Sequence, residues 1–214
     1  MFTYFSTNKI FMIIRGALLT IIGIVLLVMG GYNCYRLSTP AIDLNDPDLD
    51  WNTLRAGQHV EMDVDFIMGE YMYTKEDGSE RSRDYMLGHL AVEDETGRIY
   101  VDGMICFKVT SGNFDMADRI TQNCYKWWTD ETGATPRNTE TIHVEGILSN
   151  MNNNQKKYSS SFMYSAGFSH EQQDMYFRPL YISNNSHMGR IYLISGGIFV
   201  VIGPILLLCG IKRR

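Results

Sequence analysis

Residue patterns that carry known chemistry are missing from this sequence of 214 residues. Its 4 cysteines form no Cys-x-x-Cys pair and no Cys/His cluster at zinc spacing, which argues against a structural zinc site. No Gly-x-Ser-x-Gly occurs, so no serine is set in a nucleophile elbow. Neither His-Glu-x-x-His nor a phosphate-binding glycine loop is present. We therefore expect no metal and no cofactor, and we find no catalytic constellation.

Positive charge is scarce in the middle of the chain. Residues 37–190 carry 13 Lys and Arg against all 24 Asp and Glu, so the net charge of this segment is −11. Such a domain repels phosphate backbones, whose neutralisation supplies most of the affinity for nucleic acids. DNA and RNA are therefore not expected as partners. The same charge suits a cationic partner, a metal ion or simple solubility near a membrane surface.

Two long apolar runs, 16–33 and 191–211, bracket this acidic middle. As helices that rise about 1.5 Å per residue, both are long enough to cross a hydrocarbon core of about 30 Å. Neither run contains Asp, Glu, His or Lys, so transport of protons or ions by these helices is not expected. The sequence predicts two transmembrane helices whose partner is the lipid bilayer.

The distribution of basic residues predicts the orientation in the membrane. Five basic residues lie next to the ends of the two runs that face the chain termini, and two lie next to the ends that face the middle of the chain. The five are Lys9, Arg15, Lys212, Arg213 and Arg214, and the two are Arg36 and Arg190. Basic residues concentrate on the cytoplasmic side of membrane helices, so we expect cytoplasmic termini (1–15 and 212–214) and an extracytoplasmic middle at the cell membrane. No small-x-small cleavage pattern follows the first run, which favours an anchor over a cleaved signal peptide.

Glycines recur every seven residues in both apolar runs. They are Gly16, Gly23 and Gly30 in the first run, and Gly196, Gly203 and Gly210 in the second. Seven residues make nearly two helical turns, so each set forms a stripe that allows close helix packing in lipid. In an antiparallel pair the stripes would match Gly16 with Gly210, Gly23 with Gly203, and Gly30 with Gly196. The pair is interpreted as a hairpin within one chain, with a homodimer through the same stripes as the alternative.

The segment 34–55 is rich in Pro, Asp and Asn and predicts an acidic linker. Its aspartates resemble a calcium loop, but a loop that starts at Asp46 has Trp51 at the sixth position, where a glycine is needed. Its twelfth position is Gly57 instead of a glutamate. We therefore favour a solvated linker, and we assign a second linker to 184–190.

Between the linkers, two-residue alternation predicts a mainly-β domain over 56–183. The strands are expected at 60–66, 85–93, 98–109 (with a bulge at Gly103), 139–150 and 175–183, and a helix at 114–128. A turn is expected at 94–97, a long loop at 68–84, a hairpin tip at 151–157 and an additional strand at 158–169. The carboxylates of Glu61, Asp63 and Asp65 would share one strand face, either gathering a cation or pairing with Arg81 and Arg83.

Three segments carry a resemblance to a known fold. They are Ala-Gly-Gln-His-Val-Glu-Met-Asp-Val-Asp-Phe (56–66), Leu-Ala-Val-Glu-Asp-Glu-Thr-Gly-Arg-Ile-Tyr-Val (90–101) and Ile-His-Val-Glu-Gly-Ile-Leu (142–148). Their order resembles the oligonucleotide/oligosaccharide-binding (OB) fold. The resemblance implies a five-stranded OB-like barrel with one helix between strands 3 and 4. With its two flanking helices, the chain resembles uncharacterised bacterial two-span membrane proteins with one extracytoplasmic domain, a resemblance that implies no activity.

Two cysteines and four tyrosines are the candidate site residues of this domain. Cys106 and Cys124 are either bridged, which an extracytoplasmic location permits, or two free buried thiols. A face for a ligand or partner is expected where tyrosines gather on the second and third strands and the 68–84 loop. Its members are Tyr71, Tyr73, Tyr85 and Tyr100.

Two classes of function remain open. The first is a membrane-anchored, non-catalytic binding or assembly module of the cell envelope, whose ligand or partner is a protein, a glycan or a small molecule. The second is an envelope hydrolase or transferase that uses paired carboxylates in the outer domain. A cavity with two convergent carboxylates of raised pKa would favour the enzyme.

Overall fold

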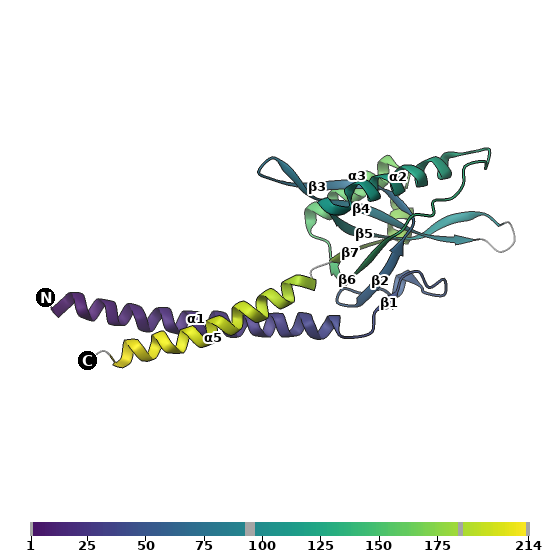
Figure 1. Cartoon of the computed structure of the whole chain (residues 1–214). Coiled ribbons are helices and arrows are strands. Elements are labelled where there is room, and N and C mark those ends of the chain that lie inside the picture. The colour runs from purple at the N-terminus through teal and green to yellow at the C-terminus, as the bar shows by residue number, and fades with distance from the viewer. Residues whose placement is uncertain (1, 93–96, 184–185, 213–214) are drawn as a thin grey trace. The chain divides into compact units, whose positions relative to one another are not determined.

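The computed structural model describes residues 2–92, 97–183 and 186–212, and it divides into two compact units. Unit 1 combines Met1–Thr39 with Asn185–Arg214, and unit 2 is Pro40–Asn184. Figure 1 shows the two long helices of unit 1 and the sheet of unit 2. Most of the turn predicted at 94–97 lies outside the described residues, as does the start of the linker predicted at 184–190.

Unit 1 is a pair of long helices, α1 (Phe2–Leu37) and α5 (Ser186–Lys212). Within them, Ile10–Leu37 and Gly189–Lys212 are long and apolar enough to cross a membrane. Helix α1 continues beyond 16–33 at both ends, and α5 already includes residues 186–190, so the linker prediction was wrong there. Pro204 lies inside α5 without ending it.

Helices α1 and α5 pack against each other through the glycines, but in a different register from the one predicted. A Cβ built on Gly16 would lie 2.7 Å from the carbonyl oxygen of Gly203, and one on Gly30 would lie 2.8 Å from that of Gly189. A Cβ on Gly196 would lie 2.9 Å from the carbonyl oxygen of Gly23. The predicted register was therefore wrong by one seven-residue repeat, which a stripe of equally spaced glycines cannot distinguish. Gly210 is buried in α5.

Unit 2 is built on a seven-stranded sheet with the order β1-β2-β6-β7-β5-β4-β3. In chain order the strands are β1 (Ile42–Asp43), β2 (His59–Val64), β3 (Ile67–Glu76), β4 (Ser79–Val92), β5 (Ile99–Thr110), β6 (Ile142–Asn150) and β7 (Phe177–Ser183). The helices are η1 (Trp51–Thr53), η2 (Ser111–Asn113), α2 (Phe114–Thr129), α3 (Asn153–Ser165) and α4 (His170–Tyr176). The mainly-β domain between two apolar helices is confirmed, but the five-stranded barrel is wrong because the sheet is open and has more strands.

The segment 68–84 is a β-hairpin instead of the predicted loop. Strands β3 and β4 pair antiparallel up to Glu76 and Ser79, which leaves Asp77 and Gly78 as a two-residue turn. Both turn residues have positive φ, 52° and 81°, as a type I′ turn requires. Asp-Gly is one of the commonest sequences for this turn, so the hairpin signal was present and outweighed by the polar residues around it.

Residues 151–169 form a helix and a connection instead of a hairpin tip and a strand. The side chain of Asn152 accepts a hydrogen bond from the backbone N–H of Gln155, and the side chain of Gln155 accepts one from the N–H of Asn152. This reciprocal capping box satisfies two backbone donors and starts α3. Ser169 and Gln172 cap α4 in the same way.

The segment after α1 is part of the folded unit and not a solvated linker throughout. Strand β1 pairs parallel with β2, and the side chains of Leu44, Trp51 and Leu54 are buried in the core. Asp50 accepts a hydrogen bond from the backbone N–H of Asn52, and further aspartates of this segment make the same local bond. The carboxylates of these aspartates therefore stabilise turns of the segment.

Gly103 marks a bulge in β5, as predicted. It pairs with His89, and the next pair is Leu90 with Val101, so one residue of β5 has no partner on β4. A Cβ on Gly103 would lie 3.0 Å from the ring of Trp51. The glycine thus allows Trp51 to pack directly on the backbone of the sheet.

Candidate functional site: an apolar cavity between two helices and the sheet

A cavity of about 400 Å³ lies between α2, α3 and the start of β3, and we call it the α2–α3 cavity. Strand β3, the residue before it and β5 supply Phe66, Ile67, Met68 and Val101. Helix α2 supplies Cys124, Tyr125, Trp128 and Thr129 from its last two turns, and α3 with the segment after it supplies Phe162, Ser165, Ala166 and Phe168. The cavity thus forms only when four segments distant in the sequence come together.

The cavity exists because of how each helix packs on the sheet. Ala117, Ile120 and Cys124 form the buried face of α2. Trp128 lies one turn after Cys124 and therefore continues this face at the C-terminal end of the helix. The rings of Phe66 and Trp128 lie 5.7 Å apart at 51°. Such a tilted aromatic pair fixes the side chains that form one wall.

Helix α3 approaches β3 closely at Gly69. A Cβ on this residue would lie 2.8 Å from two carbon atoms of the Phe162 ring. Glycine at this position therefore lets Phe162 lie against the strand backbone and close the second wall. Any larger residue would push α3 away from β3 and change the shape of the cavity.

Three polar side chains of the cavity wall are hydrogen-bonded within the chain. Cys124 Sγ donates to the carbonyl oxygen of Asp65 at 3.3 Å, Thr129 Oγ1 to that of Tyr125 at 2.8 Å, and Ser165 Oγ to that of Ser161 at 3.0 Å. Burial raises the pKa of the Cys124 thiol, which keeps it neutral. No Asp, Glu, Lys, Arg or His is among the lining residues. The cavity therefore offers apolar contact and no charge.

The predicted tyrosine face does not assemble. Tyr85 is 1% exposed and donates to Asp118, so it cannot contact a partner. Tyr71 is partly buried, and its hydroxyl is buried as well. Tyr73 and Tyr100 are 53% and 40% exposed, but their partners on β4 are Arg83 and Ala91. Eight residues of strand put these two tyrosines about 26 Å apart, so they form no common patch.

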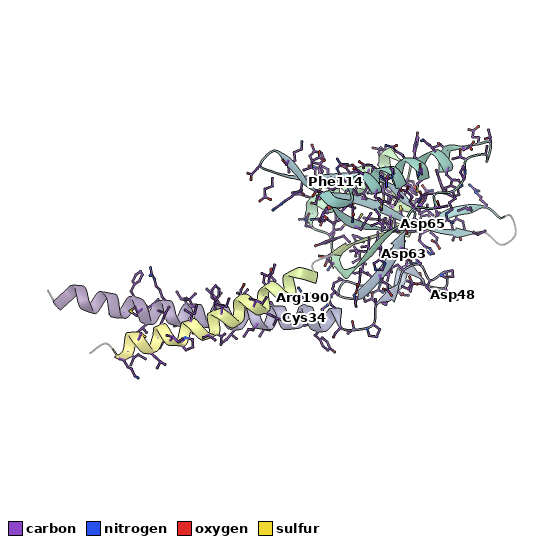
Figure 2. The ribbon with its side chains drawn as sticks, viewed as in Figure 1. Cys34, Asp48, Asp63, Asp65, Phe114 and Arg190 are labelled. Atoms are coloured by element: carbon purple, nitrogen blue, oxygen red, sulfur yellow. The ribbon has the colours of Figure 1, made fainter. Side chains whose placement is uncertain are left out.

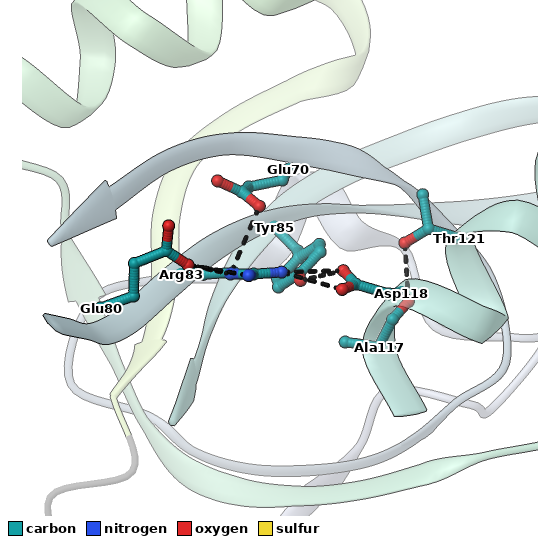
Figure 3. Close-up of polar contacts among 7 residues, drawn as sticks. All are labelled: Glu70, Glu80, Arg83, Tyr85, Ala117, Asp118 and Thr121. Carbon is teal, nitrogen blue, oxygen red and sulfur yellow. Dashed lines mark hydrogen bonds and ion pairs between the residues drawn. The ribbon is translucent and has the colours of Figure 1, made fainter. Parts of the chain in front are cut away.

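Arg83 is the centre of a polar network that joins β4 to α2 (Figure 3). Its Nη1 donates to both carboxylate oxygens of Asp118, and its Nε and Nη2 reach Oε2 of Glu80 at 2.9 and 2.7 Å. Glu70 lies 3.7 Å from Nε of Arg83, and burial raises the pKa of its carboxyl group. Each guanidinium nitrogen of Arg83 contacts at least one of these carboxylates, so the network is a structural connection.

A second polar cluster lies in the core, around Asp84. Gln155 Nε2 donates to Asp84 Oδ2 at 3.3 Å, whereas Asp84 Oδ1 is buried without a hydrogen-bond partner among the described residues, and the Tyr71 hydroxyl is buried beside the Cys106 thiol. Burial raises the pKa of the Asp84 carboxyl group, of the Tyr71 hydroxyl and of the nearby Cys106 thiol. The Tyr71 hydroxyl and the Cys106 thiol therefore keep their protons, and Asp84 binds its proton more tightly than an exposed aspartate does.

The two carboxyl groups of raised pKa do not form a catalytic pair. Glu70 belongs to the Arg83 network and Asp84 to the buried cluster with Gln155, and neither lines the α2–α3 cavity. The arrangement that would have favoured a hydrolase or transferase is thus not provided by these two residues.

Cys106 and Cys124 are both free and buried. Cys106 Sγ lies 3.6 Å from Met86 Sδ, and Cys124 belongs to the cavity wall. The alternative of two buried thiols is therefore the one that the structure shows.

Two of the three carboxylates predicted to form a row, Asp63 and Asp65, pair with basic groups other than those predicted. Asp63 lies 2.9 Å from Nδ1 of His143, and Asp65 accepts from Arg137 at 2.7 Å. Figure 2 labels Asp63 on β2 and Asp65 in the connection to β3. Arg81, which was expected here, pairs with Glu76 of the β3–β4 hairpin. Across residues 2–92, 97–183 and 186–212, no group of three His, Cys, Asp or Glu is placed to hold a metal ion.

Sequence patterns alone did not indicate the cavity. Phe162, Ala166 and Phe168 lie in the segment expected to be a strand, and Trp128 ends the helix predicted at 114–128. The Asn152 capping box was the signal that would have placed these aromatics on and after a helix.

Comparison with protein families places the chain in one of them. The model of the family described as "Domain of unknown function (DUF8577)" matches residues 7–213, so the chain belongs to this family. A search of curated proteins found no match.

Proposed function

We propose that this member of the DUF8577 family is a membrane-anchored binding module of the cell envelope that takes up an apolar ligand in the α2–α3 cavity. The observation that carries the proposal is the cavity itself. Its volume of about 400 Å³ lies within the range of ligand sites, roughly 300–1,000 Å³. Its wall is mostly aromatic and aliphatic, and Cys124, Thr129 and Ser165 donate their hydrogens within the chain.

The surface of unit 1 supports a location in a membrane. Large apolar side chains cover the outward faces of α1 and α5 and are exposed, among them Ile21, Val28, Ile194 and Val201. A surface of this kind on a soluble protein would be an aggregation site, whereas lipid covers it without cost. The basic residues at the outer ends of both helices support cytoplasmic termini and an extracytoplasmic unit 2.

The connectivity of the sheet supports an OB-like relationship, although the sheet is open. Strands β2 and β3 are separated only by Asp65 and Phe66, yet β2 is next to one end of the strand order and β3 forms the other. One bent segment, 59–76, thus lies near both ends of the sheet. Helix α2 lies between β5 and β6 in the chain, as the resemblance implies.

Photolabelling of the full chain in lipid nanodiscs tests the ligand site. The probe is 3-trifluoromethyl-3-phenyldiazirine, a small uncharged ring, and the labelled peptides are identified by mass spectrometry. We expect labels on 124–129 and 162–168 in addition to the lipid-facing residues of α1 and α5. Ala166→Trp fills the cavity and should remove only the labels in unit 2.

Ala134→Trp is the matched control, because Ala134 is exposed and does not line the cavity. This variant should leave both groups of labels unchanged. Labelled helices together with unlabelled 124–129 and 162–168 in the unmodified chain would show that the cavity binds no apolar molecule.

A further inference from the structure

We infer that the ligand of the α2–α3 cavity is one acyl chain of a membrane lipid, bound with its headgroup outside in water. The inference rests on the proposed function and adds the class of ligand. It follows from the chemistry of the wall, from the residues at the opening and from the attachment of unit 2 to apolar helices.

The wall cannot accommodate a headgroup. Cys124, Thr129 and Ser165 each donate their hydrogen to a carbonyl oxygen of the chain, and no lining residue carries a charge. A phosphate, a carboxylate or a sugar placed inside would lose its hydration without meeting a charged partner in the lining, which is unfavourable for such a group. Only the apolar part of an amphiphile therefore belongs inside.

The side chains at the opening suit the polar end of an amphiphile. Tyr125 and Trp128 line the cavity and are 67% and 49% exposed. Both have a large apolar body and one polar group, and such residues are enriched where an apolar region meets water. They provide a boundary at which an acyl chain ends and a headgroup begins.

Lipid is the apolar molecule with the highest local concentration around this protein. Helix α1 ends at Leu37 and unit 2 begins at Pro40, and β7 ends at Ser183 before α5 begins at Ser186. Since one extended residue spans at most about 3.6 Å, neither connection can be longer than about 11 Å. Because unit 2 is joined at both ends to helices of membrane length, acyl chains are a ready source of apolar ligand for its cavity.

The size of the cavity favours a chain over a single small ring. A cavity of about 150 Å³ already holds benzene, and this one has about 400 Å³. A longer chain fills more of such a space, and each added CH₂ that enters it increases the affinity about fourfold. The affinity should stop increasing once the chain is longer than the cavity.

The experiment uses the full chain in nanodiscs whose phosphatidylcholine carries a diazirine at the end of one acyl chain. We expect crosslinks from the chain end to 124–129 and 162–168, lost in Ala166→Trp and kept in Ala134→Trp. Lysophosphatidylcholines of increasing chain length should compete, with an affinity that rises about fourfold per CH₂ and then levels off. Replacement of phosphocholine by phosphoglycerol should change the affinity less than twofold.

Each other outcome contradicts the inference in a distinguishable way. If 3-trifluoromethyl-3-phenyldiazirine labels the cavity and the lipid probe does not, a ligand site exists but no acyl chain occupies it. If a photoreactive free fatty acid labels the cavity and the phospholipid does not, the source is not the bilayer. Competition by cholesterol at lower concentration than every lysolipid would assign the site to a sterol. Absence of all labels in unit 2 would overturn the proposed function as well.

Discussion

Nη1 of Arg83 donates to both carboxylate oxygens of Asp118, at 2.8 and 3.1 Å, and this pair attaches helix α2 to strand β4. Tyr85 donates to the same carboxylate at 2.7 Å, and the guanidinium of Arg83 lies 4.5 Å from the ring centre of Phe114. The start of α2 is thus fixed by hydrogen bonds to β4, while its other end forms the cavity wall.

Arg83→Gln should lower the free energy of unfolding of unit 2 by about 1.5–3 kcal/mol, since a charged hydrogen-bonding group is lost and Asp118 loses its cation. All 3 tryptophans of the chain lie in unit 2, so their fluorescence during denaturation of the full chain reports this unit. The control is Arg119→Gln, which removes an exposed pair with Glu140 and should cost under about 1 kcal/mol. Equal losses in both variants would show that the Arg83 network has no special role.

The buried carboxyl group of Asp84 predicts a pH dependence of stability. Because burial raises its pKa in the folded state above the ordinary 3.8, the folded state binds the proton more tightly than the unfolded chain does. Protonation of Asp84 therefore stabilises the folded state; this stabilisation is fully present below pH 3.8 and is lost as the pH rises through the folded pKa. Asp84→Asn should remove this dependence and raise the stability at pH 7 by about 1–3 kcal/mol.

Denaturation of the full chain followed between pH 3.5 and pH 8 checks this difference. Asp63→Asn is the control, because Asp63 is exposed beside His143 and its replacement should give no gain at pH 7. A lower stability of Asp84→Asn at pH 7 would mean that the charged carboxylate is the stabilising form.

Some of the fold was predictable from the sequence because it depends on local patterns. Apolar runs of membrane length, alternation in β2 and β6, and the apolar face of α2 are all contained in single segments. The bulge at Gly103 was predictable for the same reason. The packing of Leu44 and Trp51 on the sheet was not, because the acidic residues around them suggested a solvated segment.

The cavity was not predictable because its wall depends on contacts between distant segments. Phe66, Trp128 and Phe162 are separated by tens of residues, and only the sheet and two helices bring them together. Tyr85 was predicted to be exposed and is buried. An aromatic residue on a strand can point to solvent or to the core, and only the position of α2 decides which. Seven-residue periodicity likewise identified the helix contact surface but left its register undetermined.

Asn152→Ala should lower the free energy of unfolding by about 0.5–2 kcal/mol through loss of the α3 cap. Asn153→Ala is the neighbouring control, since Asn153 is exposed and is not the capping residue. Asn152→Ala, but not Asn153→Ala, should also weaken labelling at 162–168, because α3 carries part of the cavity wall. An unchanged stability would indicate that packing alone positions α3.

The register of the helix pair can be tested with a native cysteine. A Cβ built on Gly189 would lie 3.2 Å from Sγ of Cys34. Since a disulfide has an S–S bond of about 2.0 Å and Cβ atoms about 3.8 Å apart, a cysteine at 189 is within bonding reach. Gly189→Cys in a Cys209→Ala background should therefore crosslink to Cys34 under mild oxidation, as shown by peptide mass spectrometry.

Gly196→Cys in the same background distinguishes the two registers, because a shift of one repeat would bring residue 196 to the position of 189. In the structure Gly196 packs against Leu27 and the carbonyl oxygen of Gly23, so this variant should not crosslink to Cys34. The reverse result would restore the register in which Gly16 faces Gly210. A crosslinked species of twice the molecular mass would instead show that the glycine stripes join two chains, since an intramolecular disulfide leaves the mass of the chain unchanged.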